Sequence, residues 1–306
     1  MKKCVVIYNP YSGRKVKQNF LTEFVDILLG NDYDPDIQFS KYKGHITEII
    51  KELPDTIDLV ISLGGDGTFN EVMSGNLKRN KRLVVSHIPL GTTNDIGKMF
   101  GYGKNIINNL KLLLSGEARG IDICTINGRP FVYVAGFGRF MNIPYETSRG
   151  SKKTLGYLAY LLSGAKDLFK KNRMYDITYT VDGEEYNGIY AFMLIGNATR
   201  IAGFNNVFPD VQLDDDKFEV LLCNINRKKD IIKMLYYLRK TNITRVPGFY
   251  FHRTNSLKIK FNDPDHVDWC LDGEKLETDD NSFKIEIVKN VMVRIPKKNI
   301  SKLLTK

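Results

Sequence analysis

The sequence is poor in the residues that form metal clusters and disulfide frameworks. Its 306 residues include four cysteines and four histidines, with no CxxC pair and no ligand spacing among the histidines. This argues against a zinc site. The cysteines are Cys4, Cys124, Cys223 and Cys270. Three of them stand in apolar runs, as is typical of buried free thiols in a reducing cytoplasm.

Long apolar runs are also missing. No stretch approaches the ~20 apolar residues that span a bilayer. The apolar run within MKKCVVIYNPYSG, residues 1–13, is too short for the core of a signal peptide. We therefore expect a cytoplasmic protein that is soluble or peripherally associated with a membrane.

The charge is unbalanced, with a formal net charge of +10. Nucleic acid, nucleotide phosphates and anionic lipid headgroups would all suit this charge, and so would a surface that only maintains solubility. No recognised nucleic-acid motif is present, so we expect no nucleic-acid partner. A chain of this length, with 42% hydrophobic and 26% charged residues, is expected to form two globular domains.

The first third of the chain alternates two kinds of pattern. Short β-branched runs occupy 4–8, 36–40, 58–63 and 82–90, and helical periods occupy 16–29, 45–53 and 68–77. This order predicts a parallel sheet with crossover helices, in which ligands bind beyond the carboxyl ends of the strands.

After about residue 120, strand-like runs joined by turns replace this alternation. The Asp-Gly pairs in VDGEE (181–185) and LDGEK (271–275) are hairpin signals, and the series predicts an antiparallel sandwich or barrel. Two helical insertions are expected at 152–171 and 227–240. The expected organisation is an α/β domain over 1–125, rejoined by the tail 291–306, and a mainly β-sandwich domain over 126–290.

The segment ISLGGDGTFNEV, residues 61–72, carries the most specific signal. Glycines 64, 65 and 67 follow a strand and precede a helix, where backbone N–H groups can receive phosphate oxygens. The spacing matches neither a Walker loop nor a dinucleotide fingerprint. A carboxylate repels phosphate, so Asp66 would act through Mg²⁺ or deprotonate an acceptor hydroxyl. The alternative is a tight turn in which Asp66 caps the helix.

Two other turns carry similar residues. YNPYSGR (8–14) follows the first strand and IPLGTTND (88–95) follows the fourth. Because parallel strands point the same way, all three turns should open at one edge of the sheet. Their hydroxyls and amides suit a nucleotide, and Asp95 would add a second carboxylate near Asp66.

Together GGDGTFNEV, PLGTTND, NPYSG and LDGE resemble the diacylglycerol kinase catalytic family, in its soluble bacterial lipid kinase branch. GGDGT alone is shared with NAD kinases and phosphofructokinases. The resemblance implies an NAD kinase-like α/β nucleotide domain, a β-sandwich lipid-substrate domain, and ATP with Mg²⁺ in the cleft. It implies phosphoryl transfer to a lipid hydroxyl, foremost from ATP to diacylglycerol to give phosphatidic acid in phospholipid biosynthesis. A sphingosine- or ceramide-type kinase and an NAD kinase remain alternatives.

The resemblance also implies which residues form the site. Its ATP contacts are Asn9, Pro10, Tyr11, Ser12, Gly13, Ser40, Gly64, Gly65, Asp66, Gly67, Thr68, Phe69, Asn70, Gly91, Thr92 and Asn94. Its catalytic Mg²⁺ network is Asp66, Asp95 and Asp122. Glu274 is expected to meet Asp66 across the cleft and to accept the proton, with Asp66 as the competing base. From the sequence alone, a glutamate after an Asp-Gly turn would be a surface residue.

A second, structural Mg²⁺ is implied within PDVQLDDDKFEV, residues 209–220. Its ligands would be the Asp215 side chain and the main-chain carbonyls of Gln212 and Lys217. Asp216 replaces a family glycine here, which leaves the ligand set open. The basic helical pattern at 152–173 could lie on an anionic membrane or cover the β domain. A homodimer is compatible with this interpretation.

Overall fold

The structure is a computed structural model that describes residues 1–12, 20–138, 173–201, 204–205, 208, 210–225, 230, 247–263 and 267–305. The chain divides into two compact units. The first comprises Met1–Ile123, Gln212–Asp215 and Val288–Lys306, and the second Cys124–Val211 and Asp216–Ile287. Among the described residues, no helix has both the length and the apolar character needed to cross a membrane.

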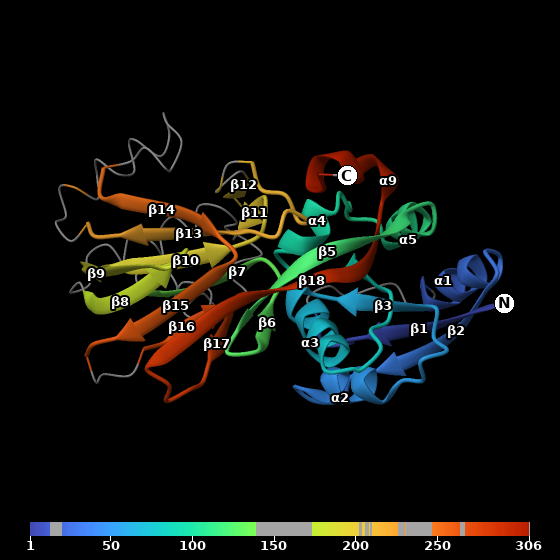
Figure 1. Ribbon diagram of the computed structural model, residues 1–306. Coiled ribbons are helices and arrows are strands. Elements are labelled where there is room, and N and C mark those ends of the chain that lie inside the picture. Colours follow the sequence, from blue (N-terminus) through green and yellow to red (C-terminus); the bar gives the residue numbers. More distant parts are fainter. Residues whose placement is uncertain are drawn as a thin grey trace. The chain divides into compact units, whose positions relative to one another are not determined.

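The first unit is built on a parallel sheet (Figure 1). The strand order is β2-β1-β3-β4, and Val293 in the second half of β18 pairs in parallel with Val85 of β4. Its elements are β1 (Lys2–Tyr8), α1 (Phe20–Leu29), β2 (Tyr33–Phe39), α2 (His45–Glu52), β3 (Leu59–Gly64), α3 (Asp66–Leu77), β4 (Val85–Pro89), α4 (Asp95–Met99), α5 (Ile106–Leu114), the first part of β5 (Glu117–Ile126), the end of β18 (Ser282–Ile295) and α9 (Lys297–Leu303).

Helices cover this sheet because each presents an apolar stripe to it. Phe24 and Leu28 of α1 are buried, as are Ile46 and Ile50 of α2. α2 packs against α3, and α1 against α5. Gly75 permits the first of these contacts, since a Cβ atom there would lie 2.7 Å from the Ile50 Cβ.

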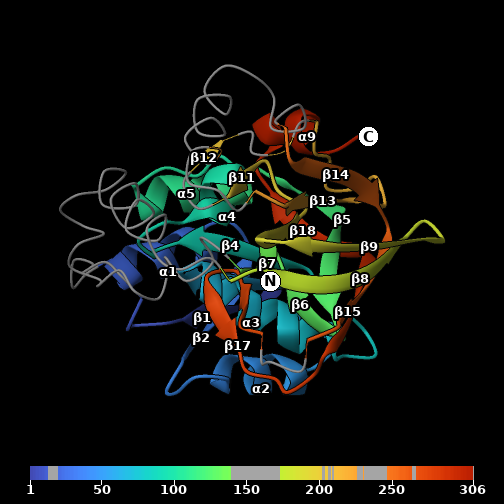
Figure 2. The ribbon, with the colours of Figure 1, turned by 90° about the vertical axis from the view of Figure 1, so that its left-hand side faces the viewer.

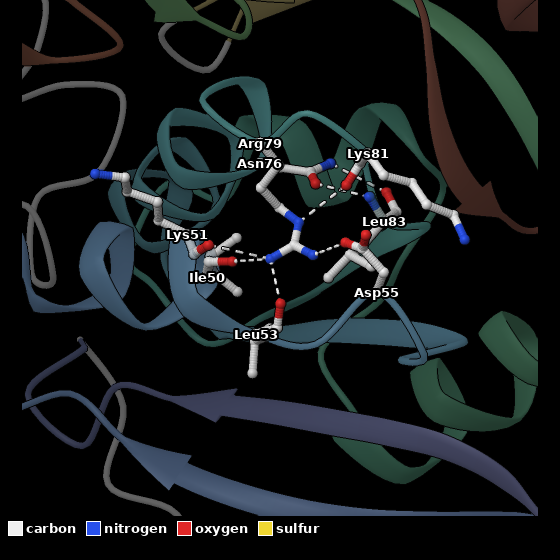
Figure 3. A network of polar contacts seen from close by, with 8 residues as sticks. All are labelled: Ile50, Lys51, Leu53, Asp55, Asn76, Arg79, Lys81 and Leu83. Atoms are coloured by element: carbon white, nitrogen blue, oxygen red, sulfur yellow. Dashed lines mark hydrogen bonds and ion pairs between the residues drawn. The ribbon is translucent and has the colours of Figure 1, made fainter.

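Arg79 ties the C-terminal ends of α2 and α3 together (Figure 3). Its guanidinium donates to the carbonyls of Ile50 at 2.9 Å and Leu53 at 2.6 Å, and to Asp55 at 2.5 Å. Only 4% of the Arg79 side chain is exposed. The last carbonyls of a helix lack intrahelical partners, so this cation satisfies partly buried acceptors that would otherwise be unpaired.

The predicted bounds of two early elements differ from the structure. β2 begins at Tyr33 rather than at residue 36, because it is the outer strand of the sheet and an edge strand tolerates Pro35. The polar, proline-containing start of this strand has the composition of a turn. The helix expected over 16–29 is described from Phe20, and residues 13–19 of that pattern lie outside the described residues.

The second unit is a sandwich of two antiparallel β layers. One layer contains β5, β6, β18, β15, β8 and β9, and the other has the order β14-β13-β10-β7-β16-β17. Figure 2 shows β8 and β9 of the first layer beside β13 and β14 of the second. The strands not yet defined are β6 (Arg129–Phe131), β7 (Val134–Gly138), β8 (Tyr175–Val181), β9 (Glu184–Tyr190), β10 (Phe192–Gly196), β13 (Phe218–Cys223), β14 (Phe249–Thr254), β15 (Ser256–Phe261), β16 (Trp269–Leu271) and β17 (Glu274–Leu276), with the short pair β11 (Arg200–Ile201) and β12 (Phe204–Asn205).

Inward-facing aromatic residues fill the space between these layers. Trp269 is fully buried, and its ring centroid lies 5.0 Å from those of Phe137 and Phe283. The predicted fold class is therefore confirmed, with a parallel α/β unit and a mainly β-sandwich unit. The predicted helical insertions at 152–171 and, apart from Asp230, at 227–240 lie outside the described residues.

Candidate functional site

Three turns meet at the carboxyl edge of the parallel sheet in the first unit. They follow β1, β3 and β4. The Leu90 N–H donates to the Gly64 carbonyl at 2.5 Å, and the Asn9 N–H donates to the Leu63 carbonyl at 3.1 Å. The Asn9 side chain also donates to the Thr68 hydroxyl at 3.2 Å. The turns therefore form one continuous surface at the strand ends.

Glycines are required where two of these turns touch. A Cβ atom on Gly91 would lie 2.8 Å from the Gly65 Cα, a distance that real Cβ contacts do not show. A Cβ atom on Gly64 would collide with the Thr68 side chain. The glycine-rich composition therefore allows close backbone packing.

Asp66 joins the second turn to the third. Its carboxylate accepts the backbone N–H of Asp95 at 3.0 Å and of Ile96 at 3.2 Å, which are the first two residues of α4. Asp66 thus caps a neighbouring helix rather than the helix that it begins. At α3, Gly65 is the N-cap residue and supplies no side-chain hydrogen bond.

The first predicted turn is organised by Asn9. The Asn9 side chain accepts the Tyr11 N–H at 3.0 Å, and the Ser12 hydroxyl donates to the Asn9 carbonyl at 2.7 Å. Ser40 is buried beyond the end of β2, where its N–H donates to the Tyr8 carbonyl at 3.0 Å. Gly13 lies outside the described residues.

The side-chain amide of Asn94 contains a buried oxygen without a hydrogen-bond partner among the described residues. Its backbone is left-handed, with φ at 52°, and its side-chain N–H donates to the Gly91 carbonyl at 2.8 Å. Its Oδ1 is buried and accepts no hydrogen bond within the described part of the chain. A buried acceptor without a partner is costly, so this atom is suited to a donor supplied by a ligand or by water.

The acids of the predicted metal network differ in position. Asp95 is 1% exposed and its backbone is bonded to Asp66, whereas Asp122 lies in β5 and its N–H donates to the Leu213 carbonyl at 2.6 Å. Among the described residues, no group of three or more His, Cys, Asp or Glu side chains could hold a metal ion. The structure therefore joins Asp66 to Asp95 but brings no three acids together within the described part of the chain.

The segment predicted to bind the structural Mg²⁺, within residues 209–220, is hydrogen-bonded to α9 and to the residue Thr305 that follows it. The Leu213 N–H donates to the Leu303 carbonyl at 2.7 Å, and the Asp214 carboxylate accepts the N–H and hydroxyl of Thr305 at 2.7 and 3.0 Å. Asp216 has φ at 62°, the left-handed conformation that glycine favours and that aspartate tolerates. Aspartate can therefore occupy this position, at which the resemblance implies a glycine.

Glu274 belongs to the second unit, where it is exposed at the start of β17. It pairs with Leu271 across the turn formed by Asp272 and Gly273. Asp272 is buried, and its carboxylate accepts hydrogen bonds from the backbone of residues 132–134. Sequence reasoning missed this residue, and its only signal was its place in the LDGE motif.

The second unit also contains a cavity of about 570 Å³ where β9 and β14 form the edges of their layers. Four tyrosines contribute to its lining, with Asn187, Asn224 and His252. Burial lowers the pKa of His252, and among the described residues no Lys, Arg, Asp or Glu lines the cavity.

Comparison with known proteins identifies the family. The model of the diacylglycerol kinase catalytic domain matches residues 3–126. A diacylglycerol kinase of Staphylococcus carnosus (strain TM300) is 30% identical over 259 residues, which cover 84% of each chain. The chain belongs to the diacylglycerol kinase family. As a member of this family, it is a lipid kinase.

Full-length relatives agree with this membership. A diacylglycerol kinase of Bacillus subtilis (strain 168) is 29% identical over 306 residues, 99% of each chain. A crystal structure described as a diacylglycerol kinase from Bacillus anthracis str. Sterne has a TM-score of 0.74 at 21% identity, over 97% of both chains. Another structure from that organism reaches a TM-score of 0.80 at 23% identity over 97% of both chains. At these identities the two solved structures support the fold alone.

Proposed function

We propose that this lipid kinase transfers the γ-phosphoryl group of ATP to the free hydroxyl of diacylglycerol, giving phosphatidic acid, and that it requires Mg²⁺. The names of its Bacillus and Staphylococcus relatives support the acceptor. Phosphoryl transfer depends mainly on positioning and charge stabilisation. The glycine turns and acidic side chains described above are suited to both tasks.

The N-terminus of α3 is the observation on which the nucleotide site rests. The positive end of this helix follows a glycine pair and has no side-chain cap from its N-cap residue. Gly65, Asp66 and Gly67 are each partly exposed there. Backbone N–H groups at such a terminus bind phosphate oxygens, so we place the ATP phosphates at this turn, next to Asn9 and Thr68.

The residues present fit a Mg²⁺ ion that arrives with ATP. Such an ion needs one or two protein carboxylates and takes its other ligands from phosphates and water. Asp66 and Asp95 would supply these two carboxylates, since the Asp66 carboxylate accepts the backbone N–H of Asp95 at 3.0 Å and the two residues therefore lie next to each other. The ion would neutralise charge on the phosphates, while Asp66 also holds the N-terminus of α4.

Glu274 is our candidate for the base that removes the proton from the acceptor hydroxyl. Its match to the family motif supports this role, and it lies on a short, hydrogen-bonded hairpin. A base positioned on the reacting hydroxyl accelerates a reaction by about 10²- to 10⁴-fold. Asp66 remains the competing candidate for this role.

A radiolabelled ATP assay tests the acceptor. Purified protein, Mg²⁺ and mixed micelles of diacylglycerol should give labelled phosphatidic acid, whereas sphingosine, ceramide and NAD should give little product. Chelation of Mg²⁺ should stop transfer. Labelling of NAD alone, or of a sphingoid lipid in preference to diacylglycerol, would refute the proposed acceptor.

Two substitutions test the acidic residues in the same assay. Asp66→Asn should lower kcat by about 10²-fold or more, since it removes a charge while keeping one acceptor for the α4 backbone. Glu274→Gln should lower kcat by about 10²- to 10⁴-fold. Asp36→Asn, an exposed acid on the edge strand β2, is the matched control and should stay within about twofold. Wild-type turnover in both site variants would reject the assignments.

The basic pattern at 152–173 supports reversible contact with anionic membranes. A lipid acceptor resides in a bilayer, and each basic residue near an anionic surface adds about 1 kcal/mol. Flotation with vesicles of phosphatidylcholine, with and without phosphatidylglycerol, tests this contact. Binding should require the anionic lipid and weaken as salt is raised; equal binding to both vesicles would contradict it.

A further inference from the structure

The second unit contains the same Asp-Gly turn twice. Val181 pairs with Glu184 across Asp182 and Gly183, and the equivalent pair in the second hairpin is Leu271 with Glu274. Both aspartates are left-handed, with φ at 51° and 49°, and both glycines have φ near 90°, at 89° and 87°. Positive φ at both central positions defines the two-residue hairpin turn that Asp-Gly favours. Local sequence and local backbone are therefore alike in the two hairpins.

The aspartates of these turns lie in different surroundings. Asp182 is exposed and accepts one side-chain hydrogen bond, from the Thr254 hydroxyl at 2.7 Å. Asp272 is 6% exposed. Its carboxylate accepts three successive backbone N–H groups, from Val132 at 2.7 Å and from Tyr133 and Val134 at 3.0 Å.

A further bond completes the attachment of the second turn. The backbone N–H of Asp272 donates to the Val134 carbonyl at 2.8 Å, so the side chain and main chain of one residue both bind residues 132–134, which end at the first residue of β7. A hairpin turn needs only the left-handed backbone, as the first turn shows. The buried carboxylate therefore serves to fix the location of the second turn, because burying a charge is costly unless such hydrogen bonds compensate it.

We propose that Asp272 is a positioning residue, which holds the hairpin carrying Glu274 at a fixed place against residues 132–134. This inference rests on the proposed function, in which the Glu274 carboxylate removes the acceptor proton. Asp272 does not touch substrate in this account. It acts through Glu274, two residues further along the chain, because misplacing a reacting group by about 1 Å can cost about 10²-fold in rate.

The central experiment replaces each aspartate by asparagine. Asn fits the left-handed backbone and keeps the side-chain shape, but its amide cannot accept three N–H bonds as a carboxylate does. Asp272→Asn should lower kcat by about 10- to 100-fold with the KM for ATP within about twofold. The matched control Asp182→Asn should leave both values within about twofold of the wild type. Equal kcat in the two variants would overturn the inference.

A double variant separates positioning from a general structural role. If Asp272 acts through Glu274, Asp272→Asn should add little to the loss already caused by Glu274→Gln. If the fold-losses in kcat of the two single variants instead multiplied in the double variant, the inference would be overturned. Wild-type kcat in Glu274→Gln would instead refute the proposed base, whereas an inactive Glu274→Gln with a fully active Asp272→Asn would refute the positioning role alone.

A second pair of variants covers the case in which Asp272→Asn fails to fold. Ala at Gly273 or at Gly183 puts the same strain on a left-handed backbone, and both sites have room for a methyl group, with no atom closer than 3.6 Å to a Cβ at Gly273. Gly273→Ala should lower kcat at least tenfold, whereas Gly183→Ala should not. Equal effects would count against the inference.

Hydrogen exchange tests the attachment without any activity. In Asp272→Asn, or in Gly273→Ala if the former does not fold, peptides covering 132–134 and 271–276 should exchange faster than in the wild type. The matched Asp182→Asn or Gly183→Ala protein should be unchanged there. Unchanged exchange in the Asp272 or Gly273 variant would refute the inference even if the acceptor lipid proved to be different.

Discussion

His87 makes the stability of the first unit sensitive to mild acid. It lies in β4 with no exposed surface, beside the ring of Phe69 at 5.1 Å between centroids. Its Nδ1 is 3.2 Å from the Ser62 hydroxyl, and its Nε2 has no hydrogen-bond partner among the described residues. Burial lowers the pKa of His87 from 6.5 to about 3. The imidazole is therefore neutral in the folded protein, and protonation favours unfolding.

The size and direction of the effect follow from linkage. An unfolded His87 binds a proton below its ordinary pKa of 6.5, whereas the folded one does so only near 3. The free energy of unfolding is therefore unaffected by this group above pH 6.5. It decreases by about 1.4 kcal/mol for each pH unit between the two pKa values. From pH 7 to pH 5 the expected loss is about 2 kcal/mol.

Urea unfolding followed by circular dichroism at pH 7, 6 and 5 measures this loss. His87→Leu removes the titrating group at similar volume, so its unfolding free energy should decrease by about 2 kcal/mol less than that of the wild type over this range. The absolute stability of the variant does not matter, because the comparison uses only the pH dependence. His45→Gln, on the surface at the start of α2, should retain the wild-type pH dependence. Parallel curves for wild type and His87→Leu would refute the reasoning.

Three further predictions concern packing in the first unit. Arg79→Ala should lower the free energy of unfolding by about 3 kcal/mol, since it leaves several helix-end carbonyls without a donor; an unchanged urea midpoint would contradict this. Gly91→Ala should cost about 2 kcal/mol through its clash with Gly65, whereas Gly103→Ala, whose Cβ would lie 4.0 Å from its nearest neighbour, the Asn109 Oδ1, should cost less than about 1 kcal/mol. Burial raises the pKa of Cys4 to about 12, so its thiol should resist a disulfide reagent at pH 8 until urea is added, as peptide mapping of the labelled protein would show.

Periodicity predicted the order of the major elements because burial imposes it. β3 is buried at all six positions, and its sequence, LVISLG, in which Ser62 is the one polar residue, is typical of a central parallel strand. The start of β2 was not predictable, since an edge strand can contain Asp34 and Pro35, which are typical of turns. Edge strands have weaker sequence signals because only one side is paired.

The direction of parallel strands was enough to predict that the three turns meet. It was not enough to predict which atoms of these turns form hydrogen bonds with one another. The sequence left Asp66 with two alternatives, a metal or hydroxyl partner or the cap of its own helix. The structure adds a third, since Asp66 binds the backbone of α4, 29 and 30 positions away in the chain. Which N–H groups a carboxylate reaches depends on how close two turns pack, and the contact of Gly65 with Gly91 sets that distance here.

The two Asp-Gly hairpins show where local reasoning ends. Their turn residues are the same and their backbones agree within 2° in φ at both central positions, so local sequence dictates local shape correctly. The two hairpins differ in their tertiary contacts, because residues 132–134 donate three N–H groups to the carboxylate of Asp272 and not to that of Asp182. Because a segment about 140 residues away supplies these donors, neither composition nor spacing could separate a surface Asp-Gly-Glu from one whose aspartate is buried. A role that depends on such packing must be assigned from the fold. It can then be tested against the Asp182–Gly183 hairpin, which has the same turn but lacks these hydrogen bonds.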